Sequence, residues 1–310
     1  MDGLLVLMVV IWGVNYSVLK RAFLELPPTV FNSLRLVLAS SVFLVGIALA
    51  RRWGPASTSS FVPVVYTPHS VTARDRAELL WLGFVGHCFY QLCFVGGLAR
   101  TTASNGALIF GTTPVVVALM SAALGRERIG RLHWIGAALS AAGIYFVVGR
   151  GASLGGSTLT GDLLIGLGVL CWAAYTIGGS RLMSRHSPLY VTGMTMAIGT
   201  VPYVVLAAPA FSDVAWRDVH AGTWAALLFA GLGAFCFAYL VWYAAVQRLG
   251  PARTSIYSNA IPLVAMFVAA AVLGEPLTAA RLGGATAIVL GVVLTRISGR
   301  RLARTAAPAE

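Results

Sequence analysis

Charged residues are scarce in this chain of 310 residues. Asp, Glu, Lys and Arg together make up 10% of the sequence, against about 25% in a typical soluble domain. Hydrophobic residues make up 58%, and the mean hydropathy is +0.83. So few charges could not cover the surface of a soluble protein of this length, which excludes an ordinary soluble enzyme, a disordered chain and a secreted disulfide scaffold. The composition predicts an all-α polytopic membrane protein.

The sequence patterns of several chemistries are also missing. The chain has no GxxxxGK[ST] phosphate loop, no HExxH zinc motif and no GxSxG nucleophile elbow. Its four cysteines form no CxxC pair, and each lies within an apolar run. No Asp or Glu occupies the middle of an apolar run. We therefore expect no enzyme activity, no catalytic residues, no metal and no cofactor, and proton antiport through a buried carboxylate is unsupported.

The formal net charge of +12 has two readings. A basic balance can indicate nucleic-acid binding. Here the basic residues are arginines apart from Lys20, and they are spread between the apolar stretches. This distribution is typical of loop charges that orient membrane helices. We expect the lipid bilayer and a small-molecule substrate as partners and no nucleic acid, and the sequence leaves the oligomeric state open.

Ten apolar stretches are long enough to be transmembrane helices. The first is too long for the core of a signal peptide, so we expect it to remain as a span. A polar loop of about residues 52–77 separates spans two and three, and residues 298–310 form a cytoplasmic tail. The predicted spans are 3–24, 30–50, 78–98, 103–124, 131–149, 161–182, 189–210, 222–246, 252–274 and 279–297.

The basic residues predict how these spans are oriented. Fifteen lie in the set of loops that includes both termini, and six lie in the opposite set. Loops rich in Lys and Arg stay in the cytoplasm. We therefore expect a multi-pass protein of the inner (plasma) membrane with both termini cytoplasmic, which requires an even number of spans.

The two halves of the chain repeat each other. Pro114, Glu127, Gly136 and Gly143 return 148 positions later as Pro262, Glu275, Gly284 and Gly291, and the Trp12 region of span one returns 160 positions later at Trp172 of span six. Each copy holds five spans, and an odd number inverts the second copy in the membrane. The sequence thus predicts two inverted five-helix repeats around a central cavity, residues 1–150 and 151–297, which is the architecture of alternating-access transporters.

At these residues the chain resembles the drug/metabolite transporter superfamily, EamA type. The features that carry the resemblance are Trp12-Gly13, the two proline helices that end in Glu127 and Glu275, and the glycines that follow them. The resemblance covers about residues 4–297. It implies a basket of ten helices with a central cavity, and transport, often export, of amino acids, other metabolites or toxic compounds.

Polar and aromatic residues at helical spacing indicate which faces line the cavity. Polar groups inside a span are costly and tend to face a cavity or another helix. Aromatic stripes also serve packing, and amides also bond helix to helix, so we weigh these roles about equally for the three amides. The candidate cavity residues are Asn15, Tyr16, His87, Gln91, Trp172, Tyr175, Tyr239, Trp242 and Asn259.

Five positions carry more specific expectations. Pro114 and Pro262 each free a backbone carbonyl one turn earlier, which favours a hinge or a static bend. Arg35, near the start of span two, is expected to snorkel outward or to pair with Glu25. His87 is expected to be neutral and bonded across helices. Glu275 is expected to cap a helix or to pair with a loop arginine.

These features together predict a transporter, an exporter of small metabolites such as amino acids or amines, that works by alternating access. Coupling is open between facilitated diffusion, exchange and an indirect proton link through His87. A non-transporting scaffold or receptor is the alternative, and it would need no polar cavity face. An intramembrane enzyme is weaker, because it would need a nucleophile and base or a metal cluster.

Overall fold

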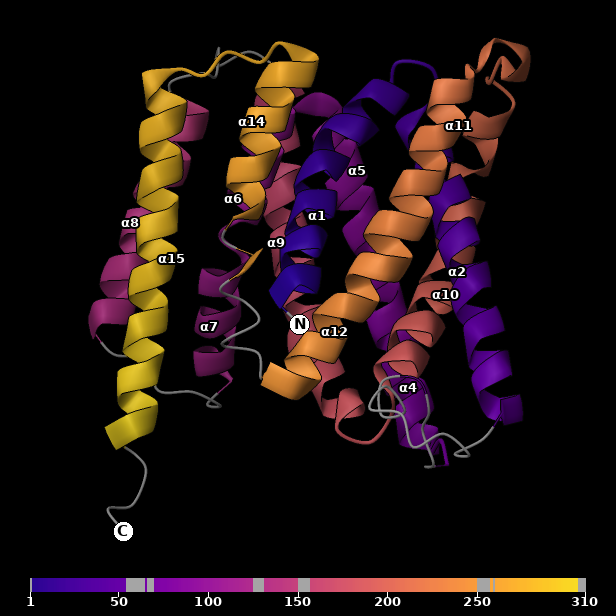
Figure 1. Cartoon of the computed structure of the whole chain (residues 1–310), viewed down its shortest axis with the longest axis horizontal. Coiled ribbons are helices and arrows are strands. Elements are labelled where there is room, and N and C mark those ends of the chain that lie inside the picture. The colour runs from indigo at the N-terminus through magenta and orange to yellow at the C-terminus, as the bar shows by residue number, and fades with distance from the viewer. Residues whose placement is uncertain are drawn as a thin grey trace.

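The computed structural model describes residues 2–53, 65, 70–124, 131–149, 157–249, 257–258 and 260–305. Every regular element in these ranges is helical, as the sequence predicts (Figure 1). The elements are α1 (Asp2–Ala22), α2 (Pro28–Trp53), α4 (Ala73–Gly83), the π-helical η1 (Phe84–Phe89), α5 (Tyr90–Arg100), α6 (Ala103–Phe110), α7 (Thr113–Ala123), α8 (Arg131–Gly149), α9 (Ser157–Met183), α10 (Pro188–Ala207), the 3₁₀ turns η2 (Ala208–Phe211) and η3 (Trp216–Asp218), α11 (Ala221–Leu228), the π-helical η4 (Phe229–Phe237), α12 (Ala238–Leu249), α14 (Ile261–Leu273) and α15 (Ala279–Thr305).

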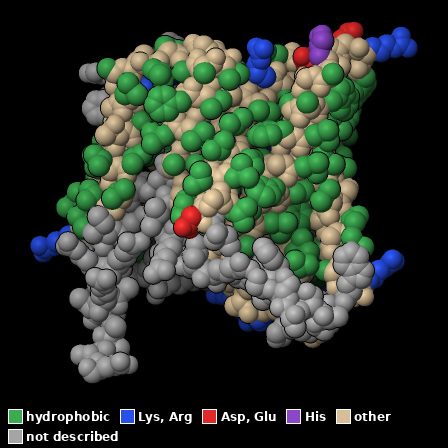
Figure 2. All heavy atoms as spheres, viewed as in Figure 1, with side chains coloured by type: hydrophobic (Ala, Val, Ile, Leu, Met, Phe, Trp, Pro, Cys, Tyr) green, Lys and Arg blue, Asp and Glu red, His purple; other side chains and the backbone are tan. Residues whose placement is uncertain are grey.

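The apolar helices follow the predicted spans in order along the chain. Within the described residues, six helical stretches are long and apolar enough to cross a membrane, and four shorter apolar helices lie where the remaining spans are expected. The count of ten crossings stays a prediction. In Figure 2, hydrophobic side chains cover the middle of the visible face, and most charged side chains lie near its upper and lower ends. This distribution suits a bundle with a lipid-facing belt.

The third apolar stretch begins earlier than hydropathy indicates. Thr72 and Asp75 form a capping box, in which the Thr72 hydroxyl accepts from the Asp75 N–H and the Asp75 carboxylate accepts from the Thr72 N–H. Asp75 is buried, and the Arg185 guanidinium lies 2.7 Å from its carboxylate. The last residues of the predicted 52–77 loop are therefore the first turn of α4, held against the turn between α9 and α10.

Four helix pairs build the bundle: α2 with α10, α5 with α9, α1 with α14, and α8 with α15. The α8–α15 pair forms the left edge of the molecule in Figure 1. Its helices approach closely, because a Cβ on Gly143 would lie 2.8 Å from the Gly284 carbonyl oxygen and a Cβ on Gly291 would lie 2.5 Å from that of Gly136. Small residues at such a crossing let two backbones touch, as is common in membrane bundles.

At one end of the bundle, polar side chains hold the helix termini together. Lys20 Nζ donates to the carbonyl oxygens of Leu98 (3.2 Å) and Thr101 (2.9 Å) at the end of α5. The Glu275 carboxylate accepts from the first backbone N–H groups of α6, which confirms the capping role expected for it. Its repeat counterpart, Glu127, lies outside the described residues.

Candidate functional site: an aromatic and polar centre

Aromatic rings from both halves of the chain fill the centre of the bundle. The ring centroid of Tyr239, on α12, lies 5.8 Å from that of Trp12 on α1 and 5.5 Å from that of Trp172 on α9. The His87 ring, in η1, lies 6.2 Å from Tyr239. These are favourable distances for ring contacts. Tyr239 thus joins three helices that are far apart in the sequence.

The cluster continues toward α5 and α6. Tyr90 lies 5.4 Å from Trp172, 5.7 Å from Phe94 and 5.9 Å from Phe110, measured between ring centroids. Tyr16 on α1 joins through Phe94, at 5.6 Å. The stripes read from helical spacing in spans one, three and six therefore face one shared space.

His87 lies in a π-helical turn that the sequence did not indicate. Its repeat counterpart, Phe235, lies in the second π-helical turn, η4. Such turns inside α-helices are frequent at functional sites. The His87 ring packs edge-to-face on Tyr175 at 5.0 Å, and neither ring nitrogen has a hydrogen-bond partner within the described chain. The cross-helix hydrogen bond that we expected for His87 is thus absent there.

Arg35 is the polar residue that sequence reasoning misplaced. Its side chain does not snorkel: Arg35 is 1% exposed, and its Nη2 donates to Gln91 Oε1 at 3.0 Å. Its Nε donates to Asn32 Oδ1, and its Cζ lies 4.4 Å from the centroid of the Phe235 ring. Glu25, its expected partner, instead accepts hydrogen bonds from the backbone N–H of His220 and from the Thr223 hydroxyl.

A signal for this placement was present in the sequence. Asn32 and Arg35 are three residues apart and therefore share one helix face. An ionisable residue inside a span faces the bundle interior more often than lipid. Arg35 lies near one end of span two, which favoured snorkelling. The amide of Asn32 on the same helix face instead indicates that the Arg35 side chain points into the bundle.

The other candidate cavity residues are placed as follows. Asn15 is buried, and its Oδ1 has no hydrogen-bond partner in the described ranges. The Tyr175 hydroxyl lies 3.1 Å from that of Thr195. Trp242 is half-buried, with its ring centroid 5.7 Å from that of Trp12. Asn259 lies outside the described residues.

Pro114 lies beside an interruption of its span rather than at a simple kink. Span four is divided into α6 and α7 by Gly111 and Thr112, and Pro114 lies in the first turn of α7. The Phe110 carbonyl, which Pro114 cannot bond, accepts from the Thr113 hydroxyl at 2.5 Å. Pro262 lies in the first turn of α14. The Phe110 carbonyl thus keeps a hydrogen bond although the helix is interrupted.

The interruption in span four touches the proline of span nine. A Cβ on Gly111 would lie 2.5 Å from Pro262 Cγ, so only glycine permits this approach without a shift. Discontinuous helices that meet near the middle of a membrane bundle are typical of transporter binding regions.

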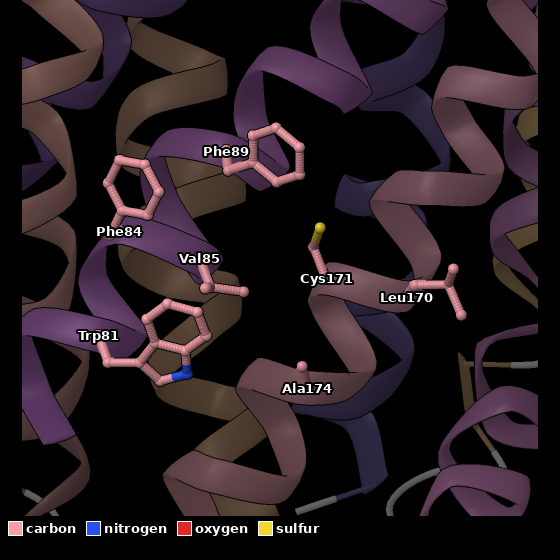
Figure 3. A pocket seen from close by; sticks show the side chains of 7 residues that line it. All are labelled: Trp81, Phe84, Val85, Phe89, Leu170, Cys171 and Ala174. Carbon is pink, nitrogen blue, oxygen red and sulfur yellow. The ribbon is translucent and has the colours of Figure 1, made fainter.

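An apolar groove lies on a different side of these helices. It has a volume of about 440 Å³ and is lined by Trp81, Phe84, Val85 and Phe89 from α4 and η1 and by Leu170, Cys171 and Ala174 from α9. In Figure 3 the labelled residues of α4 and η1 lie on one side and those of α9 on the other. None of the candidate cavity residues lines it. Its apolar walls suit contact with lipid rather than recognition of a polar substrate.

The central cluster combines aromatic surface with buried polar groups, among them Asn15 Oδ1 and both His87 ring nitrogens, that have no hydrogen-bond partner in the described chain. No group of three or more His, Cys, Asp or Glu side chains that could hold a metal ion occurs among the described residues.

Comparisons with known proteins identify a family. The model of the EamA-like transporter family matches residues 1–149 and 159–297. A Bacillus subtilis protein named "Uncharacterized transporter YyaM" is 28% identical over 79% of this chain and 82% of its own length. A Salmonella typhimurium protein named "Probable amino-acid metabolite efflux pump" is 26% identical over 98% of this chain and 97% of its own length.

The fold also matches a solved one. A crystal structure aligns with a TM-score of 0.65 at 17% sequence identity, and the alignment covers 96% of this chain and 98% of that one. The likeness concerns the fold alone.

Proposed function

The chain belongs to the EamA-like transporter family, and from this premise we propose that it exports small metabolites, such as amino acids or amines, by alternating access. It is a multi-pass membrane transporter, and its relatives point away from an enzyme. The observation that carries the proposal is the central cluster in which Tyr239 contacts rings from α1, η1 and α9. The name of the Salmonella relative supports export and an amino-acid-like substrate.

The two halves, residues 1–150 and 151–297, act as inverted repeats in this proposal, followed by a cytoplasmic tail over residues 298–310. Contacts between equivalent positions support it. The hydroxyls of Ser40 and Thr200, 160 positions apart, lie 2.9 Å from each other. Gly83 in the first half packs against Thr195 in the second half. The equivalent of Gly83 in the second half is Gly231, and the equivalent of Thr195 in the first half is Arg35. These two residues also pack against each other. A two-fold relation between inverted units would produce such reciprocal contacts.

Alternation requires an element that can adopt two arrangements. The contact between Gly111 and Pro262 joins the interruption in span four to the start of α14. We assign this contact as the hinge region, because the first helix is already broken there and a rotation would sacrifice few backbone hydrogen bonds. The cluster around Tyr239 would then open first to one side of the membrane and then to the other.

Energy coupling is proposed to need no intramembrane carboxylate. Facilitated diffusion and exchange both fit, and an indirect proton link would run through His87, whose ring nitrogens are unpaired in the described chain. We place the protein in the inner (plasma) membrane with both termini in the cytoplasm, on the basis of its loop charges and its bacterial relatives.

The proposal is tested in two steps. Metabolites retained and released by cells with and without the protein are compared first, by untargeted mass spectrometry. Compounds that differ are then loaded into proteoliposomes that contain the purified chain, and their efflux is followed. We expect at least one small metabolite to leave faster from proteoliposomes than from protein-free vesicles. Equal rates for every such compound would contradict a transport function.

A further inference from the structure

A buried arginine without a counter-charge stands at the edge of the central cluster. A guanidinium carries five N–H donors and is always charged. Two of its nitrogens, Nε and Nη2, reach Asn32 and Gln91, while Nη1 is buried without a partner. No carboxylate in the described parts of the chain lies within ion-pair distance of Arg35. A buried charge left in this state is costly, and such a residue is kept for function more often than for stability.

The unpaired nitrogen of Arg35 calls for an acceptor. Its Nη1 is a buried donor without a partner in the described chain, whereas the side chains of Asn32 and Tyr203 interact with each other. A buried guanidinium with a free nitrogen suits an anion, and a planar carboxylate matches the fork of a guanidinium.

The charge of the site limits its ligand. Lys20, the one lysine, donates to carbonyl oxygens at the end of α5. It therefore adds no second positive charge to the site at Arg35. One guanidinium balances one negative charge, so a phosphate monoester with two charges would be left partly uncompensated in a low-dielectric setting. A single carboxylate group fits the balance.

The aromatic neighbours indicate what the rest of the ligand is like. Phe235, which packs on the guanidinium, lies 5.8 Å from Tyr239, measured between ring centroids. Tyr239 leads on to Trp172 and Trp12. A ligand whose carboxylate is held at Arg35 would therefore lay an apolar or aromatic body along this wall.

The site exists in one half only. The position equivalent to Arg35 in the second half is Thr195, whose hydroxyl lies 3.1 Å from that of Tyr175. A cation on one side of a pseudo-symmetric centre gives the substrate a fixed orientation.

We propose that Arg35, held by Asn32, binds the carboxylate of the transported metabolite and so selects small compounds with a carboxylate, including amino acids, over compounds that lack one. The proposal rests on the proposed transport function, since it assigns part of the same site.

Binding is tested on the purified full chain in detergent, by the shift in its thermal unfolding. The probes are L-phenylalanine, L-leucine and 3-phenylpropionate, each paired with its amide, which keeps the shape and removes the negative charge. We expect at least one acid to stabilise the wild-type chain, with its amide needing about a 10- to 100-fold higher concentration for the same shift. Arg35→Gln should abolish this difference, and Arg35→Lys should weaken it.

The matched control is Arg100→Gln, because Arg100 is exposed and, among the described residues, its side chain bonds only the Gly96 carbonyl of its own helix. It should keep the preference for acids. Without ligand, Arg35→Gln should unfold at a higher temperature than the wild type, since it no longer buries an unpaired charge; a merely structural arginine would give a lower temperature. Amides that bind as well as their acids, no acid that binds, or an unchanged preference in Arg35→Gln would each overturn the proposal.

Flux measurements separate this proposal from the proposed function. Proteoliposomes that carry amides as fast as acids would leave transport standing and remove the carboxylate site. Acid-selective binding without flux of any compound would leave the site standing and remove transport.

Discussion

The carboxylate of Glu275 accepts a hydrogen bond from the backbone N–H of Ala103 at 2.7 Å, so the end of α14 closes over the start of α6. Its second oxygen accepts from Ser104 at 3.2 Å, and Arg281 lies 3.6 Å away. An anion at a helix N-terminus satisfies free N–H groups and complements the helix dipole. Ala103 and Glu275 are 172 residues apart and belong to opposite halves of the chain, so this contact ties the halves together at one end of the bundle.

We expect Glu275→Ala to destabilise the folded protein by about 1 kcal/mol, the usual cost of a lost helix cap. Glu275→Gln should fall between this variant and the wild type, because an amide oxygen still accepts one bond but carries no charge. Thermal unfolding in detergent measures both. An Ala variant as stable as the wild type would mean that the contact does not hold the helices together.

A second carboxylate gives a pH-dependent contact outside the spans. The Thr223 hydroxyl and then the backbone N–H of His220 bond Glu25 and lower its pKa. A lowered folded-state pKa means that this stabilisation is present above the ordinary pKa of a glutamate and is lost as the pH falls through the lowered value. The difference in stability between wild type and Glu25→Gln should therefore shrink on acidification below about pH 4. A difference that stays constant from pH 7 to pH 3 would refute this assignment.

The loop charges predict a membrane topology. Reporter fusions within residues 52–77 and at the C-terminus should both read cytoplasmic, and a fusion between Asp213 and Asp218 should read external. The reason is the excess of arginine in the first set of loops. A cytoplasmic signal between Asp213 and Asp218 would contradict the inverted-repeat arrangement.

Much of this fold is predictable from the sequence. Hydropathy places the apolar helices in order, and helical spacing selects faces that meet, as with Tyr16 and Phe94 or Trp172 and Tyr239. Residues that repeat with the period of an α-helix lie on one face of it, and that face is the one buried in a bundle.

Other features depend on contacts that one segment cannot reveal. The π-helical turn at His87 uses residues that would equally form an α-helix, so local propensity does not distinguish the two. The early start of α4 depends on burial of Asp75 beside Arg185, which comes from a distant turn. Arg35 points into the bundle because its guanidinium donates to Gln91 and packs on the Phe235 ring, and both residues come from other helices.

Transport should not require an imposed pH gradient, because no carboxylate lies in the middle of a predicted span. Reconstituted protein is expected to move its substrate down a concentration gradient at equal pH on both sides. Strict proton dependence that persists in His87→Gln would show that the proton takes a path other than His87, and this account of coupling would be wrong.

Asn259 is expected to orient the substrate, on the basis of its helical spacing with Ser255 and Pro262. Asn259→Ala should weaken transport about fivefold, the effect of losing one polar contact of about 1 kcal/mol. Asn259→Leu should be worse, since it also adds apolar bulk. Val293→Leu, on an exposed position of α15, serves as the control and should be nearly silent. Normal flux per inserted Asn259→Leu molecule would make Asn259 a packing residue.

The measurement that tests the central claim most directly is efflux per inserted molecule for Tyr239→Ala in proteoliposomes. Val205→Ala is the matched control, because Val205 is 67% exposed on α10 and has no place in the cluster. If the rings around Tyr239 form the substrate site, Tyr239→Ala should lower this rate by about tenfold or more, the effect of losing several ring contacts, while Val205→Ala stays at the wild-type rate. A Tyr239→Ala rate per inserted molecule equal to the wild type, with only the inserted amount reduced, would contradict the account.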